Sequence, residues 1–108
     1  MMDTLAALFD LIKQRKAEPQ EGSYTCYLFE KGLDKILKKC GEECSETIIA
    51  AKNGNNAETT EEICDLMYHL LVLMAEQGVE LAQVEAVLEQ RRVKIGNLKQ
   101  QHQSDRNT

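Results

Sequence analysis

Turn-forming residues are scarce in this sequence, whose 108 residues include one proline and six glycines. An all-β fold needs many tight turns, so this scarcity argues against one. The apolar fraction of 43% is too high for an intrinsically disordered chain. The composition therefore predicts a single all-α domain, small enough that oligomerisation would help it to bury apolar surface.

Long apolar runs and basic stripes are also missing. No run reaches the roughly 18 residues of a membrane-spanning helix, and the first residues lack both parts of a signal peptide, its basic segment and its apolar run. We therefore expect no membrane partner and a cytoplasmic location. The net charge of −5 argues against nucleic acid as a partner, but not against a small phosphorylated ligand.

The four cysteines contain no CxxC pair, which argues against a disulfide framework or a zinc ribbon. Cys40 and Cys44 lie one helical turn apart on an apolar stripe, so we expect them to pack in the core as small hydrophobic residues. A soft-metal site built from Cys40, Cys44, Cys64 and His69 is the alternative. Reduced thiols fit the cytosol.

Apolar residues recur at helical spacing in four stretches of the chain. The first predicted helix covers residues 4–16, and the second ends near Lys52, with Gly32 as a break or kink near its start. An Asn-Gly-Asn-Asn turn leads to the third helix, which ends at Gly78, and a fourth follows. The predicted fold is thus a helical bundle of four main helices.

The third predicted helix is apolar almost all round, and a chain of this length offers few neighbours to cover it. We therefore expect dimerisation to complete the bundle. Residues 1–99 form the predicted domain, and residues 100–108 are predicted to be a polar, frayed tail.

Carboxylates gather in two places. Glu42, Glu43 and Glu46 lie on the second predicted helix, and Glu62 and Asp65 lie on the third. Residues three or four apart share a helix face, and the short turn should bring the two groups opposite each other. Like charges so close repel one another unless a hard divalent cation takes their oxygens. The pattern therefore predicts a site for one to three such ions.

The same acids also have a structural interpretation. Thr59 at an N-cap position and Glu62 three residues later fit a capping box at the start of the third helix. The acids of the second helix could form a solvated face paired with Lys38 and Lys39. Gly41 has no side chain, and so it could admit the third helix or a substrate closely.

Several residues near the acids have two readings each. Lys35 and Lys39 share a face with the first acidic group and could hold phosphate oxygens or remain solvated, as could Arg91 and Arg92. His69 lies one turn beyond Asp65, and we favour a core histidine bonded to that acid over a ligand or a catalytic group.

The order Glu42-Glu43-x-x-Glu46 followed by Glu62-x-x-Asp65 is similar to the signature of the all-α nucleoside triphosphate pyrophosphohydrolase (MazG-type) superfamily. Within it, further segments between about residues 4 and 95 resemble the phosphoribosyl-ATP pyrophosphatase family of histidine biosynthesis. These are Gly22–Thr25, Leu28–Gly32, Lys35–Ile36, Lys38–Lys39, Gly41–Glu43, Ala50–Asn53, Asp65–Leu70 and Val72–Leu73.

The resemblance implies a magnesium-dependent homodimer in which water attacks the triphosphate of phosphoribosyl-ATP, giving phosphoribosyl-AMP and pyrophosphate. It implies that Glu43, Glu46, Glu62 and Asp65 are the metal ligands. It implies catalytic roles for Glu42, Glu43 and Glu46, with Glu42 either a further ligand or the residue that orients the water. It also implies that substrate contacts come from Ser23, Tyr24, Thr25, Lys35, Lys39, Lys52 and Asn53.

Two other functions fit the residues. A house-cleaning pyrophosphohydrolase of non-standard nucleoside triphosphates would share the acids, and the segment Ser23–Thr25 favours the histidine-pathway reaction over it. A non-catalytic helical interaction module, in which the acids serve as caps and solvated surface, is the reading from a different class. No cyclohydrolase domain accompanies the sequence, so we expect the stand-alone form of the activity.

Overall fold

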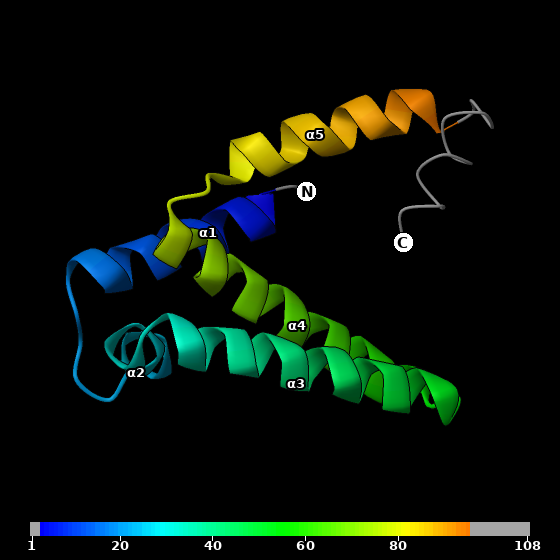
Figure 1. Cartoon of the computed structure of the whole chain (residues 1–108), viewed down its shortest axis with the longest axis horizontal. Coiled ribbons are helices and arrows are strands. Elements are labelled where there is room, and N and C mark those ends of the chain that lie inside the picture. Colours follow the sequence, from blue (N-terminus) through cyan, green and yellow to red (C-terminus); the bar gives the residue numbers. More distant parts are fainter. Residues whose placement is uncertain (1–2, 96–108) are drawn as a thin grey trace.

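The computed structural model describes residues 3–95. Over that range the chain forms five α-helices and no strand, which confirms the all-α class (Figure 1). The helices are α1 (Asp3–Ala17), α2 (Tyr24–Lys31), α3 (Leu33–Lys52), α4 (Asn56–Gln77) and α5 (Leu81–Lys94). The predicted tail, residues 100–108, and the last residues of the predicted domain lie outside the described range.

The structure does not confirm the predicted count of four helices, because the second predicted helix is divided at Gly32. This residue has φ = +93°, a backbone conformation that residues with a side chain rarely adopt. Its N–H donates to the Leu28 carbonyl at the end of α2, and its carbonyl accepts from the Ile36 N–H at the start of α3. In Figure 1 α2 is seen end-on beside α3, so the chain turns sharply at this glycine.

Helices α3 and α4 run antiparallel, side by side along most of their length, and are the most closely associated pair (Figure 1). A short turn joins them, and Asn55 caps α4 by accepting the Glu58 N–H with its side-chain oxygen at 3.0 Å. The predicted cap at Thr59 is therefore wrong, because α4 begins three residues before it. Glu62 consequently lies inside α4 and has no capping role.

The hydrophobic core lies at the end of the α3–α4 pair that is remote from the turn. Four helices contribute to it, and its fully buried side chains are Ile12 from α1, Leu28 from α2, Ile36 from α3 and Val72 from α4. Because α3 and α4 are antiparallel, the first half of α3 meets the second half of α4 in this core. The two predicted groups of acids, on α3 and α4, lie between the core and the turn.

Large apolar side chains remain exposed on the described part of the chain. Helix α5 contains no buried residue and extends away from the α3–α4 pair in Figure 1. The most exposed apolar residues of α3 and α4 include Ile48 at 63% and Ile49 at 59%. Among residues 3–95 no helix is long and apolar enough to cross a membrane. The cytoplasmic location stays a prediction.

Candidate active site

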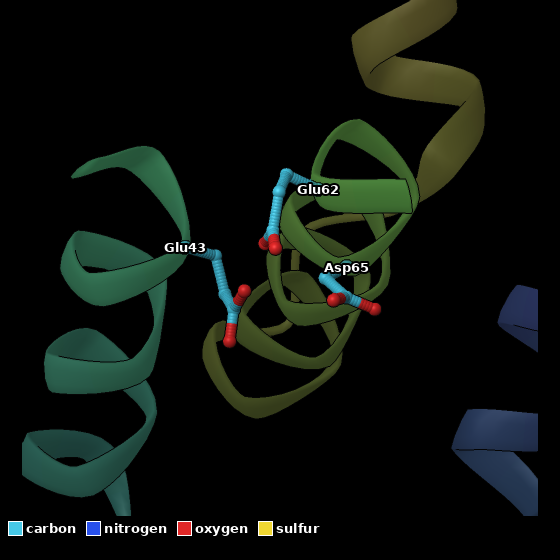
Figure 2. Close-up of side chains that lie close together, drawn as sticks. All are labelled: Glu43, Glu62 and Asp65. Carbon is cyan, nitrogen blue, oxygen red and sulfur yellow. The ribbon is translucent and has the colours of Figure 1, made fainter. Parts of the chain in front are cut away.

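Three of the predicted acids meet between α3 and α4. One carboxylate oxygen each of Glu43, Glu62 and Asp65 lies within 4.8 Å of the other two. Figure 2 shows Glu43 reaching from α3 toward the side chains of Glu62 and Asp65 on α4. The i to i+3 spacing places both α4 acids on the side that faces α3. The predicted meeting of the two acidic groups is thus observed for these three residues.

Two of these carboxylates have a buried oxygen without a hydrogen-bond partner. They are Oε1 of Glu43, whose residue is 6% exposed, and Oε1 of Glu62. Buried polar atoms in proteins are nearly always paired, so two adjacent exceptions are unusual. Burial raises the pKa of Glu62 to about 7, and the charges of Glu46 and Asp65 act in the same direction. The site is therefore short of positive charge.

Glu46 and Glu42 lie at the edge of this cluster. Glu46 is exposed but close enough to Glu62 to raise its pKa through a hydrogen bond as well as through its charge. Glu42 pairs with Lys39, whose Nζ lies 3.2 Å from Glu42 Oε1 and 3.6 Å from Glu43 Oε2. The hydrogen bond from Lys39 holds the pKa of Glu42 below its usual value. Lys39 thus supplies one positive charge beside the cluster.

The start of α2 approaches the same region of α4. The hydroxyl of Tyr24 lies 3.0 Å from His69 Nε2, and the hydroxyls of Thr25 and Tyr68 are hydrogen-bonded to each other. His69 is 4% exposed, which confirms a core histidine. Its Nδ1 lies 2.7 Å from the backbone carbonyl oxygen of Asp65, so the expected bond to the carboxylate of that residue is absent.

These side-chain contacts between α2 and α4 were not foreseen from the sequence. The spacing of Asp65 and His69 indicated that they would meet, since residues four apart on a helix are neighbours. Nothing in a single sequence pairs Tyr24 with His69 or Thr25 with Tyr68, because each pair joins residues more than 40 positions apart. The packing of α2 against α4 creates both contacts.

Other predicted substrate residues make their described contacts outside the cluster. Lys35 Nζ is 5.9 Å from the centre of the Tyr27 ring, and Lys52 and Asn53 are exposed at the end of α3. Ser23 caps α2, since its side chain accepts the Cys26 N–H. Arg92 pairs with Glu89 of its own helix. The described contacts of these residues are therefore local ones.

Two expectations about the neighbourhood of the acids are wrong. A Cβ built on Gly41 would meet no described atom within 4 Å, so the close approach of the third predicted helix is wrong, whereas the close approach of a substrate stays a prediction. Cys44 is exposed rather than packed in the core of the described chain, and Cys64 is exposed as well. Cys40 is half-buried, and its thiol donates to the His69 carbonyl at 3.6 Å.

The donor set of the cluster fits a hard divalent cation. Carboxylate oxygens are the ligands that Mg²⁺ and Ca²⁺ prefer, and a cation between Glu43, Glu62 and Asp65 would pair the oxygens that otherwise have no partner. Thiol and imidazole ligands, which softer metals prefer, are absent from this described group. These three acids belong to the pattern by which the sequence resembles the all-α pyrophosphohydrolase class.

Comparison with known proteins is consistent with that class. A model of the family described as phosphoribosyl-ATP pyrophosphohydrolase matches residues 5–92. The chain therefore belongs to this family. It is 56% identical to the phosphoribosyl-ATP pyrophosphatase of Clostridium botulinum (strain Kyoto / Type A2), over 94% of this chain and 93% of that protein. It is 57% identical to the phosphoribosyl-ATP pyrophosphatase of Listeria welshimeri, over 91% of this chain and 94% of that protein. It is 54% identical to the phosphoribosyl-ATP pyrophosphatase of Lactiplantibacillus plantarum, over 91% of this chain and 92% of that protein.

Proposed function

We propose that this chain hydrolyses phosphoribosyl-ATP to phosphoribosyl-AMP and pyrophosphate, a step of histidine biosynthesis. Support comes from the family match over most of the chain and from relatives of this name that align over nearly their whole length. The structural observation that carries the proposal is the group formed by Glu43, Glu62 and Asp65, with its two buried and unpartnered oxygens. A polyphosphate substrate needs cations, and this group is suited to hold them.

The cation we propose is Mg²⁺, held by Glu43, Glu62 and Asp65, with Glu46 joining from the edge of the cluster. When bound, it supplies positive charge that neutralises phosphate oxygens and makes water a better nucleophile. Supporting this role, a hydrogen bond from Glu46 and its negative charge both contribute to the raised pKa of Glu62. Four carboxylates give enough charge for more than one ion.

Glu42 is the residue we propose to orient the attacking water. Lys39 holds its pKa below the usual range, so the carboxylate is ionised at neutral pH and can accept a hydrogen bond from water. A carboxylate whose pKa is lowered is a weaker proton acceptor, since catalytic bases work best with a pKa near the working pH. Orientation rather than proton removal is therefore the role that its chemistry suits.

Lys39 is the side chain we propose to contact the phosphates. Its ammonium group lies 3.6 Å from Glu43 and 26% of the side chain is exposed, so it borders the cluster on the solvent side. A lysine in this position can hold a phosphate oxygen as a point charge while the acids hold the metal. Substitution by methionine should therefore raise KM more than it lowers kcat.

A second copy of the chain is the partner that we propose for the exposed apolar residues of α3 and α4. Ile63, Met67 and Leu70 share one face of α4, and each is at least 40% exposed. Monomeric proteins rarely leave such contiguous apolar surface in water. Sedimentation of the wild-type protein should give a dimer, and Met67→Glu should shift it toward the monomer. A wild-type monomer at micromolar concentration would contradict this part of the proposal.

The direct test is release of pyrophosphate from phosphoribosyl-ATP, compared with ATP and dUTP, with and without Mg²⁺. Of the three substrates, we expect only phosphoribosyl-ATP to release pyrophosphate, and only when Mg²⁺ is present. Glu62→Gln should abolish it, and Glu61→Gln should not, because Glu61 is the exposed neighbouring acid outside the described cluster. Preference for dUTP would refute the proposed substrate, and no release from any of the three would refute the proposed reaction.

A further inference from the structure

The first turn of α2 is joined to α4 by two parallel hydrogen bonds. Consecutive residues of α2, Tyr24 and Thr25, bond to consecutive residues of α4, His69 and Tyr68. Helix α2 has only eight residues, too few for a helix to be stable without its neighbours. These two contacts therefore help to fix where α2 begins, directly beside the turn of α4 that carries Asp65.

The two bonds of His69 determine which nitrogen carries the proton. A backbone carbonyl can only accept, so Nδ1, at 2.7 Å from the Asp65 carbonyl oxygen, must be the donor. Nε2 of a neutral ring then has only a lone pair, and it accepts the proton of the Tyr24 hydroxyl at 3.0 Å. The hydrogen bonds thus run in one direction from Tyr24 to Asp65.

This direction restricts what Tyr24 can do for a substrate. Its hydroxyl proton is committed to His69, so its oxygen has only lone pairs left. Phosphate oxygens are acceptors as well, and they gain nothing from a second acceptor. A role for Tyr24 as a hydrogen-bond donor to phosphate is therefore excluded while the bond to His69 exists. Burial raises the pKa of the Tyr24 hydroxyl, and the charges of Lys39 and Glu43 act on that pKa in opposite directions.

His69 is also the point where three helices meet. Its ring joins α2 through Tyr24, its carbonyl accepts the thiol of Cys40 from α3, and its Nδ1 holds the Asp65 carbonyl within α4. The Asp65 backbone is thereby tied to both helices that flank it. The carboxylate of Asp65 is exposed and is not itself held by any hydrogen bond that the structure shows. Its direction depends on the backbone that carries it.

We propose that Tyr24 and His69 are positioning residues of the carboxylate cluster: the chain Tyr24 O–H to His69, and His69 Nδ1–H to the Asp65 carbonyl, holds Asp65 beside Glu43 and Glu62 for the divalent cation. This inference rests on the proposed metal site. Partners of this kind, one step removed from the metal, set ligand orientation and affinity in metal sites generally. Neither residue touches the ion or the substrate in this role.

The test uses two tyrosines whose hydroxyls form different hydrogen bonds between α2 and α4. Tyr24→Phe removes the hydroxyl that bonds His69, and Tyr68→Phe removes the hydroxyl that bonds Thr25, one residue away on each helix. Mn²⁺ affinity is measured by electron paramagnetic resonance without substrate. We expect Tyr24→Phe to weaken Mn²⁺ binding roughly tenfold and Tyr68→Phe to change it by less than about twofold. His69→Leu should weaken binding at least as much as Tyr24→Phe.

The outcomes of this test are distinct. Equal weakening by both tyrosine variants would mean that the bonds only anchor α2, which overturns the inference. No weakening by Tyr24→Phe would overturn it as well. In either case wild-type Mn²⁺ binding leaves the proposed metal site standing. If the wild-type protein binds no Mn²⁺, the proposed metal site itself is wrong and the inference fails with it.

A second readout needs neither metal nor substrate. The ¹⁵N resonances of a histidine ring distinguish its two neutral tautomers, and the sequence contains only two histidines, so His69→Gln identifies the signals of His69. We expect the Nδ1–H tautomer in the wild type and in Tyr68→Phe, with a shift of the Nε2 resonance in Tyr24→Phe. The Nε2–H tautomer in the wild-type protein would overturn the inference, since Tyr24 would then accept rather than donate.

Discussion

Glu43→Gln should make the metal-free protein more stable at pH 7. Charges 4.8 Å apart repel by about 3.5 kcal/mol at an effective dielectric constant of 20, and Glu43 faces both Asp65 and a Glu62 that is about half ionised. The attraction between Glu43 and Lys39 at 3.6 Å offsets about 4.6 kcal/mol of this repulsion at the same dielectric constant. Adding the cost of the unpartnered Oε1, we expect a net gain of about 1 kcal/mol for the variant.

The same substitution should have the opposite effect when Mg²⁺ is present. A ligand at 100 times its dissociation constant stabilises the folded state by about 2.7 kcal/mol, and this gain belongs to the wild type. The variant lacks one of the acids and should gain little. For a domain of this size about 1 kcal/mol corresponds to a Tm change of about 4–8 °C. Thermal unfolding should therefore rank the variant above the wild type in EDTA and below it in Mg²⁺.

Glu61→Gln is the matched control, because it removes a neighbouring exposed acid of α4 that is not part of the described cluster. It should shift Tm little in EDTA and should retain the stabilisation by Mg²⁺. Two results would refute the reasoning. One is a Glu43→Gln protein that is less stable than the wild type in EDTA, as expected for a damaged core. The other is a wild type whose Tm does not respond to Mg²⁺ or Mn²⁺.

Three further predictions concern single residues. Gly41→Ala should raise the free energy of unfolding by about 0.5–1 kcal/mol, because the position is helical and open. Calorimetry measures this change, and a lower free energy of unfolding would contradict the prediction. Burial raises the pKa of Glu62 from 4.5 to about 7, so the metal-free protein should lose stability as the pH rises from about 4.5 to about 7. In a plot of the denaturant midpoint against pH, Glu62→Gln should remove this decline. An unchanged plot would contradict the raised pKa of Glu62. Leu28→Ala removes a side chain that is 0% exposed and should lower the free energy of unfolding in urea by about 2–5 kcal/mol. An unchanged free energy of unfolding would contradict this prediction.

The sequence predicted those features that depend on periodicity and local spacing. Helix α1 and the turn before α4 follow from apolar recurrence and from an Asn-Gly-Asn-Asn run, and the all-α class follows from both. The meeting of Glu43 with Glu62 and Asp65 was predicted because a short turn between antiparallel helices leaves little freedom of alignment. These inferences required only geometry within one hairpin.

Features that depend on competing local choices were predicted less well. Asn55 and Thr59 are both good N-cap residues, and Asn55 is the N-cap because α4 starts directly after the turn. Gly32 and Gly41 are both glycines within apolar stripes, yet Gly32 ends a helix at positive φ and Gly41 lies inside one. The break or kink at Gly32 was predicted, but not that it separates two helices. The hydrogen bond from Tyr24 to His69 depends on how the break at Gly32 orients α2.

The central claim is that a divalent cation binds between α3 and α4. The most direct measurement is anomalous scattering from a crystal of the protein containing Mn²⁺ in place of Mg²⁺. The account predicts a peak between the carboxylates of Glu43, Glu62 and Asp65, at about the 2.0–2.2 Å typical of such ligands. A well-ordered cluster with no peak, or a peak held only by residues outside it, would contradict the account.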